Sequence, residues 1–221
     1  MPGPKTGLEL VKAMIRGGEK AYQDFFRISG GEWFDEAPEY FLTTYVAGAA
    51  GNGENSYALL EVPVNMTRKE AGAIRRGRPA MHERKNGRFD VVLYWANGNP
   101  RAAVEVKSPI WSATRQKIIP DIDRLCTTLV ASKDSTFQFC AFLFYASVSK
   151  PNRKHDNPSQ RLRALLGRIE ARACEKVVEH GVKAVLVPGS VHSGNEVDDG
   201  AWAIAAVVVA RPTGIRNFSG E

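Results

Sequence analysis

The spacing of hydrophobic residues along this 221-residue chain changes repeatedly between a helical and an alternating period. Glycine pairs interrupt and close the first helical pattern, so that helix is expected to be short and broken. Pro38 suits the first turn of the second helix, and Ser159 and Gly181 are the expected caps of the last. Helical spacing predicts helices over residues 8–28, 38–51, 112–132 and 159–181, with part of 68–77.

Strand-like segments alternate with these helices. The Asn97-Gly98 pair lies between two of them and predicts a β-hairpin. No linker rich in Pro, Gly or Ser divides the chain, so one domain is expected over residues 1–221. The fold class is therefore predicted as α/β, with a central mixed β-sheet flanked by helices. Apolar, β-rich runs predict strands over residues 56–66, 88–95, 101–107, 137–147, 183–189 and 201–212.

Three charged residues lie in the predicted hairpin, where a buried strand usually carries none. Side chains alternate between the two faces of a strand, so Glu105 and Lys107 point to one face while the neighbouring valines point to the other. Asp90 lies on the partner strand, about 4.8 Å away. The hairpin therefore brings Asp90 within a few ångströms of Glu105 if the strand register allows it.

Two interpretations fit this arrangement. Adjacent carboxylates repel each other unless a cation lies between them, and Mg²⁺ or Mn²⁺ accepts carboxylate, water and phosphate oxygens as ligands. A lysine beside such a pair orients a water or stabilises the negative charge that develops during phosphodiester hydrolysis. Alternatively, Asp90, Glu105 and Lys107 are strand-end residues that only reach solvent. The spacing alone leaves both interpretations open.

A longer motif carries a resemblance to a known family. Phe89-Asp90, fourteen further residues and then Glu105-Val106-Lys107 resemble the motif of the PD-(D/E)xK nuclease superfamily, the restriction-endonuclease-like fold. Phe89 stands where that motif has proline. The resemblance covers about residues 36–146 and includes the order helix, three strands, helix, strand. Residues 159–212 would extend this core.

The resemblance implies a Mg²⁺-dependent or Mn²⁺-dependent nuclease that hydrolyses DNA. Asp90 and Glu105 would hold the metal, with the backbone carbonyl of Val106 as a further ligand. Glu39, in a helix similar to the first core helix of the superfamily, would bind the metal directly or through water. Lys107 would position or activate the attacking water.

A second motif, Asp121-x-x-Arg124-Leu125, resembles one that some members carry in the helix after the lysine strand. The resemblance gives Asp121 and Arg124 a supporting or phosphate-contacting role, for which Asp123 competes. Their alternative is a surface ion pair at i, i+3 on the helix. The alternative for the whole protein is a catalytically silent DNA-binding or regulatory module that retains the nuclease fold.

Charge supports a polyanionic partner. The net charge is +6 and the isoelectric point is about 9.3, which suits phosphate contacts to DNA, with RNA as an alternative substrate. Basic residues concentrate in residues 68–88 and again in 149–163. A solvated loop or helix face is the alternative for each segment, but two such segments in one chain favour contact with a phosphate backbone. The candidate nucleic-acid contacts are Arg75, Arg76, Arg78, Arg84, Lys85 and Arg88.

The remaining features bear on location and assembly. The longest apolar run, residues 201–210, is half of the roughly 20 residues that span a bilayer, and no signal peptide is evident. The three cysteines form no paired pattern, so a cytoplasmic protein without a membrane partner is expected. A homodimer would suit double-strand cleavage. Trp111 follows the lysine strand and is a candidate for stacking on bases, although aromatic residues more often belong to the core.

Overall fold

The computed structural model of the chain describes residues 5–52, 56–73, 87–113, 115–149, 157–193 and 200–218. Their strands form one seven-stranded sheet with the order β1-β2-β3-β4-β7-β5, and β6 pairs with β7 at one end. The strands are β1 (Ser56–Pro63), β2 (Arg88–Trp95), β3 (Pro100–Ile110), β4 (Phe139–Val148), β5 (Lys183–Pro188), β6 (His192–Ser193) and β7 (Ala201–Ala210).

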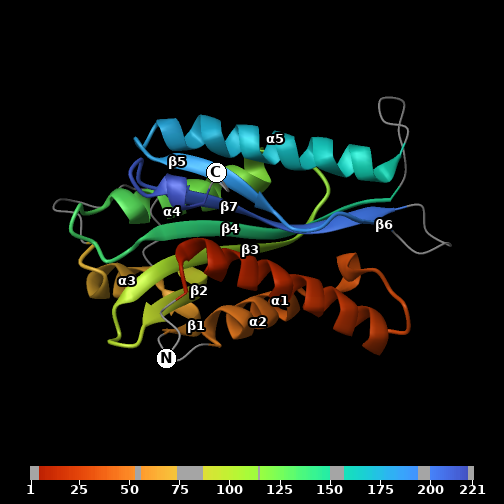
Figure 1. The fold of residues 1–221 in the computed structure, drawn as a ribbon, viewed down its shortest axis with the longest axis horizontal. Helices are drawn as coiled ribbons and strands as arrows, with labels where there is room; N and C mark the ends of the chain where they lie inside the picture. Colours follow the sequence, from red (N-terminus) through yellow and green to blue (C-terminus); the bar gives the residue numbers. More distant parts are fainter. Residues whose placement is uncertain are drawn as a thin grey trace.

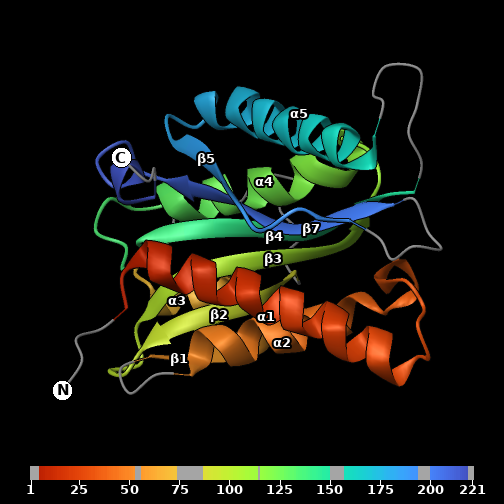
Figure 2. The same ribbon diagram turned by 45° about the vertical axis from the view of Figure 1, so that its right-hand side comes forward.

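Helices cover both faces of this sheet (Figure 1). α1 and α2 lie on one face and α4 and α5 on the other, which the turned view shows as three layers (Figure 2). The predicted α/β class with a mixed sheet between helices is therefore confirmed. The helical segments are α1 (Gly7–Ile28), η1 (Phe34–Glu36), α2 (Glu39–Gly51), α3 (Val64–Glu70), α4 (Arg115–Val130), α5 (Pro158–Val178) and η2 (Ile215–Asn217).

The strand directions make the sheet mixed. β1, β2 and β3 pair antiparallel, whereas β3 and β4 pair parallel. A parallel pair needs a crossover connection, and α4 provides it. β7 then pairs antiparallel with both β4 and β5, so the last strand of the chain lies inside the sheet.

The core consists of two apolar layers separated by the central strands. All ten residues of β4 are buried, because α1 covers one face of the strand while α4 and α5 cover the other. Phe142 and Phe144 pack in the layer below α4 and α5, and Leu143 and Tyr145 pack on the opposite side. A strand buried on both faces explains the continuous apolar run in its sequence.

The first helix differs from its prediction. α1 runs unbroken for 22 residues through Gly17 and Gly18, so the expectation of a short, broken helix was wrong. A Cβ on Gly17 would lie 2.7 Å from the backbone oxygen of Tyr45, and one on Gly18 would lie 2.9 Å from the side chain of Ile204. The glycines therefore allow α1 to approach α2 and the sheet closely, and they do not end the helix.

Several further boundaries shift. Asn157, not Ser159, caps α5 by accepting a 2.8 Å hydrogen bond from the backbone N–H of Gln160. β1 ends at Pro63, earlier than predicted, because α3 begins at the next residue. The helix predicted within 68–77 is described only up to residue 73, and its formed part begins before that range. Within the described segments, no helix combines the length and the apolar character that crossing a membrane would need.

Candidate active site

The site is built where β2 and β3 stop pairing. The last paired residues of the two strands are Val91 and Val104. Continuing this register by one residue sets Asp90 opposite Glu105, on the same face of the sheet. Beyond that point, the carboxylate of Asp90 accepts a 2.6 Å hydrogen bond from the backbone N–H of Val106. A side chain thus takes the place of a backbone partner, and the two strands form a fork.

Burial dominates the electrostatics of the two facing acids. Glu105 is only 3% exposed. Burial raises its pKa to about 9, with Asp90 adding to the rise and Arg124 opposing it. Burial likewise raises the pKa of Asp90, the Val106 amide lowers it, and the negative charge of Glu39 raises it again. Two adjacent carboxylates repel each other when both are ionised, which favours the protonated form of one of them when no cation lies between them.

Arg124 of α4 reaches the fork from the layer formed by α4 and α5. Its Nε lies 2.7 Å from Oε1 of Glu105, and its Nη2 donates a 2.6 Å hydrogen bond to Asp121. The Nε–Oε1 pair is close enough for an ion pair but is not aligned as a hydrogen bond, since both buried atoms lack a hydrogen-bond partner among the described residues. Arg124 therefore bridges Glu105 and Asp121, whereas Asp123 pairs with Lys176 of α5 and with His180.

Glu39 and Lys107 meet at the outer side of the same fork. Glu39 is the first residue of α2, and one of its carboxylate oxygens accepts a 3.0 Å hydrogen bond from the backbone N–H of Ser108. The other oxygen lies 3.4 Å from Nζ of Lys107, with both side chains more than one third exposed. The helix start thus docks onto the end of β3, and the lysine faces solvent beside the acids.

The contacts at the fork bring together Asp90, Glu105, Glu39 and Lys107, the acids and the lysine of the predicted site. Within the described part of the chain, no group of three or more His, Cys, Asp or Glu side chains is arranged to hold a metal ion. Asp90 and Glu105 are the two carboxylates at the fork, and Glu39 is directed to Ser108 and Lys107. Two carboxylates nevertheless fit Mg²⁺, which usually completes its octahedral shell with water and phosphate.

Two oxygens at the fork are candidate metal ligands. Oε1 of Glu105 is buried and makes no hydrogen bond to any described residue, although Nε of Arg124 lies 2.7 Å away. The carbonyl of Val106 points to the same side of β3 as its N–H, which is directed at Asp90. The residues that would hold a divalent cation are therefore Asp90, Glu105 and the Val106 carbonyl.

Most of the predicted nucleic-acid contacts lie outside the described residues. Arg88 is described, and its guanidinium donates a 2.8 Å hydrogen bond to the carbonyl oxygen of Glu61 on β1. The contacts outside the described ranges are Arg75, Arg76, Arg78, Arg84 and Lys85.

The docking of Ser108 onto Glu39 was not predicted from the sequence. A backbone amide carries no residue-type signal, so the pattern of side chains could not reveal this contact. A second unpredicted feature is Asp35, which accepts a 2.7 Å hydrogen bond from the indole N–H of Trp111. Nothing in the spacing of Asp35 and Trp111, 76 residues apart, indicates that they meet.

Comparison with models of protein families, with curated proteins and with solved structures finds no match to this chain. The class of the molecule is therefore defined by its own geometry: an α/β protein with a mixed sheet, and with the buried Glu105 facing the partly buried Asp90 at a strand fork.

Proposed function

We propose that the protein is a metal-dependent phosphodiesterase that hydrolyses DNA with Mg²⁺ or Mn²⁺. The observation that carries the proposal is the pair of acids at the strand fork: the buried Glu105 and the partly buried Asp90 face each other, and burial raises the pKa of both. Keeping two such carboxylates ionised requires a cation. Lys107 lies on the same strand at the rim of the fork, where a phosphate and a water could approach.

The order of elements supports a restriction-endonuclease-like core. The segment α2-β1-α3-β2-β3-α4-β4 contains the order helix, three strands, helix, strand that the resemblance to the PD-(D/E)xK superfamily implies, with the short helix α3 inserted between β1 and β2. β1, β2, β3 and β4 are also consecutive in the sheet. The acids and the lysine occupy the ends of the second and third strands, so the motif and the topology agree with each other.

Each residue has a distinct part in the proposed reaction. Asp90, Glu105 and the Val106 carbonyl would bind the metal, which would polarise the phosphate and lower the pKa of a bound water. Lys107 is held beside the fork by Glu39 and would orient that water or stabilise charge on the phosphate oxygens. Arg124 would hold the side chain of Glu105 in place from the α4–α5 side of the sheet.

The proposal is tested by substitution of the lysine. Lys107→Ala should reduce metal-dependent nicking of plasmid DNA at least 100-fold, a typical loss for a group that stabilises the transition state, while folding and DNA binding persist. Lys183→Ala is the matched control, because Lys183 is an exposed lysine on β5 at the far edge of the sheet. Nicking should require Mg²⁺ or Mn²⁺ and stop in EDTA. Full activity of Lys107→Ala would refute the mechanism.

The ion pairs at the fork favour one alternative. Arg124 is an ion-pair partner of Glu105, and Lys107 is an ion-pair partner of Glu39. The chain thus supplies its own cations to Glu105 and Glu39. A DNA-binding or regulatory module without turnover would retain such pairs. A salt-sensitive shift of DNA without nicking under any metal condition would support this binding role. An RNA substrate in the same assay tests the remaining substrate alternative.

A further inference from the structure

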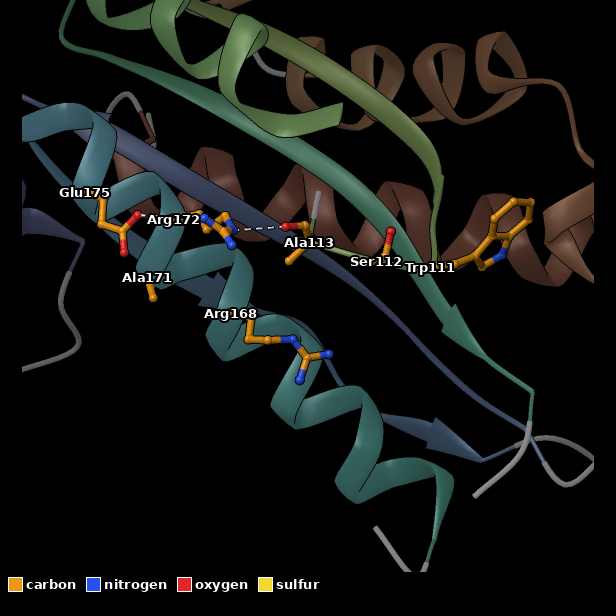
Figure 3. Close-up of a pocket in the computed structure, with 7 residues that line it drawn as sticks. All are labelled: Trp111, Ser112, Ala113, Arg168, Ala171, Arg172 and Glu175. Atoms are coloured by element: carbon orange, nitrogen blue, oxygen red, sulfur yellow. Dashed lines mark hydrogen bonds and ion pairs between the residues drawn. The ribbon is translucent and has the colours of Figure 1, made fainter. Parts of the chain in front are cut away.

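A groove lies between the connection that follows β3 and the helix α5. Its volume is about 410 Å³, within the range of roughly 300–1,000 Å³ that is typical of ligand pockets. One wall is the segment Trp111-Ser112-Ala113, and the other is formed by side chains of α5, among them Arg168 and Arg172 (Figure 3). Trp111 is four residues beyond Lys107, so the groove starts at the end of the strand that carries the lysine.

The indole of Trp111 is an exposed but fixed surface. It is 55% exposed, whereas Trp202 is 4% exposed. Its N–H donates a 2.7 Å hydrogen bond to Asp35, whose same oxygen accepts a 2.9 Å bond from Ser147 of β4. Asp35 therefore anchors the edge of the ring, and more than half of the side chain stays open to solvent. A large aromatic side chain held in this way suits stacking better than core packing.

The opposite wall provides positive charge. Arg168 and Arg172 are one helical turn apart on α5, so they lie on the same face of the helix. Arg172 is tethered by a 3.1 Å hydrogen bond from its Nε to the carbonyl of Ala113 and lies 3.9 Å from Glu175. Arg168 is exposed, makes no hydrogen bond or ion pair with the described residues, and is among the residues of α5 that line the groove (Figure 3).

We propose that an unpaired segment of a DNA substrate lies in this groove, with one base stacked on Trp111 and its phosphates beside Arg168 and Arg172. This inference rests on the proposed nuclease function. A base inside a duplex is already stacked on its neighbours, so only an unpaired base can use the indole as a platform. The groove would thus select single-stranded or frayed DNA and lead it toward the end of β3.

The test measures binding of a short, labelled oligothymidylate by fluorescence anisotropy. EDTA is present so that no strand is cleaved. Trp111→Ala should weaken binding about 5- to 150-fold, the range expected for loss of one base–aromatic stack. Trp111→Phe keeps a ring but loses the bond to Asp35, so it should retain most of the affinity. This pair of variants separates stacking from the structural effect of the anchor, which thermal unfolding monitors in parallel.

The arginine is tested through salt dependence. Arg168→Ala should reduce the slope of log affinity against log salt concentration by about 0.7, the value for one lost phosphate contact to a single strand. Arg163→Ala is the matched control, because Arg163 is exposed on the same helix but does not line the groove. This control should leave the slope unchanged.

Three outcomes would overturn the proposal for the groove. The first is an unchanged affinity of Trp111→Ala, and the second is an equal change of the salt slope in Arg163→Ala and Arg168→Ala. The third is an equal loss of affinity for duplex and single-stranded DNA. These results are distinct from failure of the nuclease proposal, which is read from cleavage by the wild type and Lys107→Ala. Single-strand binding that depends on Trp111 without cleavage would refute the nuclease and leave the groove in place.

Discussion

The backbone N–H of Val106 donates a 2.6 Å hydrogen bond to the carboxylate of Asp90, at the point where β2 and β3 cease to pair. The bond connects the two strands through a side chain, so both acids are held at the fork without a regular ladder. It also directs the carbonyl of Val106 toward the same opening. The electrostatics of the fork can be tested through Glu105 and Arg124.

The first prediction concerns pH and metal. Burial raises the pKa of Glu105 from 4.5 to about 9, so the folded state favours its protonated form. The corresponding stability is fully present below pH 4.5 and is lost as the pH rises toward 9. Without metal, Glu105→Gln should therefore gain at least about 1.4 kcal/mol relative to the wild type between neutral and alkaline pH, the equivalent of one pKa unit.

Thermal unfolding in EDTA and in Mg²⁺ across this pH range measures the effect. Mg²⁺ should raise the melting temperature of the wild type increasingly as the pH rises, because it binds the ionised acids. The Glu105→Gln variant should respond little. Parallel pH profiles of the two proteins would show that the pKa of Glu105 is not raised in the folded state.

The second prediction concerns Arg124, the ion-pair partner of Glu105. Arg124→Met should destabilise the protein by about 1–3 kcal/mol, because it leaves buried polar atoms of Glu105 without their partner. Adding Glu105→Gln should recover part of this loss, since the neutral amide needs no cation. Urea denaturation of the two single variants and the double variant forms a cycle that isolates the coupling. Strictly additive effects would mean that Arg124 stabilises the fold independently of Glu105.

The third prediction concerns the clamp between α4 and α5. Asp123 lies 2.7 Å from Nζ of Lys176 and 2.9 Å from Nε2 of His180. Burial raises the pKa of Asp123, but hydrogen bonds from Lys176 and His180 lower it below its ordinary value of 3.8. Its contribution to stability is therefore present above pH 3.8 and is lost as the pH falls through the lowered pKa.

Asp123→Asn should accordingly lower the free energy of unfolding by about 1 kcal/mol at neutral pH. The difference in unfolding free energy between the variant and the wild type should shrink as the pH falls below 3.8, the ordinary pKa of aspartate. Chemical denaturation at neutral and acidic pH measures both values. A difference that stays constant over this range would show that the charge of Asp123 does not stabilise the clamp.

The fourth prediction concerns close packing of helices. Gly17→Ala would place a Cβ 2.7 Å from the backbone oxygen of Tyr45, so it should destabilise the protein by about 1–3 kcal/mol through overpacking. Gly48→Ala is the matched control in α2, where a Cβ would meet nothing within 4 Å. It should stabilise by up to about 1 kcal/mol through helix propensity. Equal effects of the two variants would contradict the packing argument.

Parts of the site could be predicted because they are local. Alternation along β3 places Glu105 and Lys107 two residues apart on one strand, and Asn97-Gly98 turns β2 back beside it. The pairing of Asp90 with Glu105 was less certain from the sequence. A register shift at Leu93/Tyr94 lies between the turn and the acids, so counting from the turn does not fix which residues face each other.

By itself, the sequence determined the α/β class, the hairpin and the strand that carries the acid and the lysine, because periodicity and turn residues act over a few neighbouring positions. Only the tertiary structure decided that Arg124 reaches Glu105 and that the start of α2 docks onto Ser108. It also decided that α1 continues through its glycines. These features join elements far apart in the chain and depend on how closely the layers pack, which the local pattern of residues does not encode.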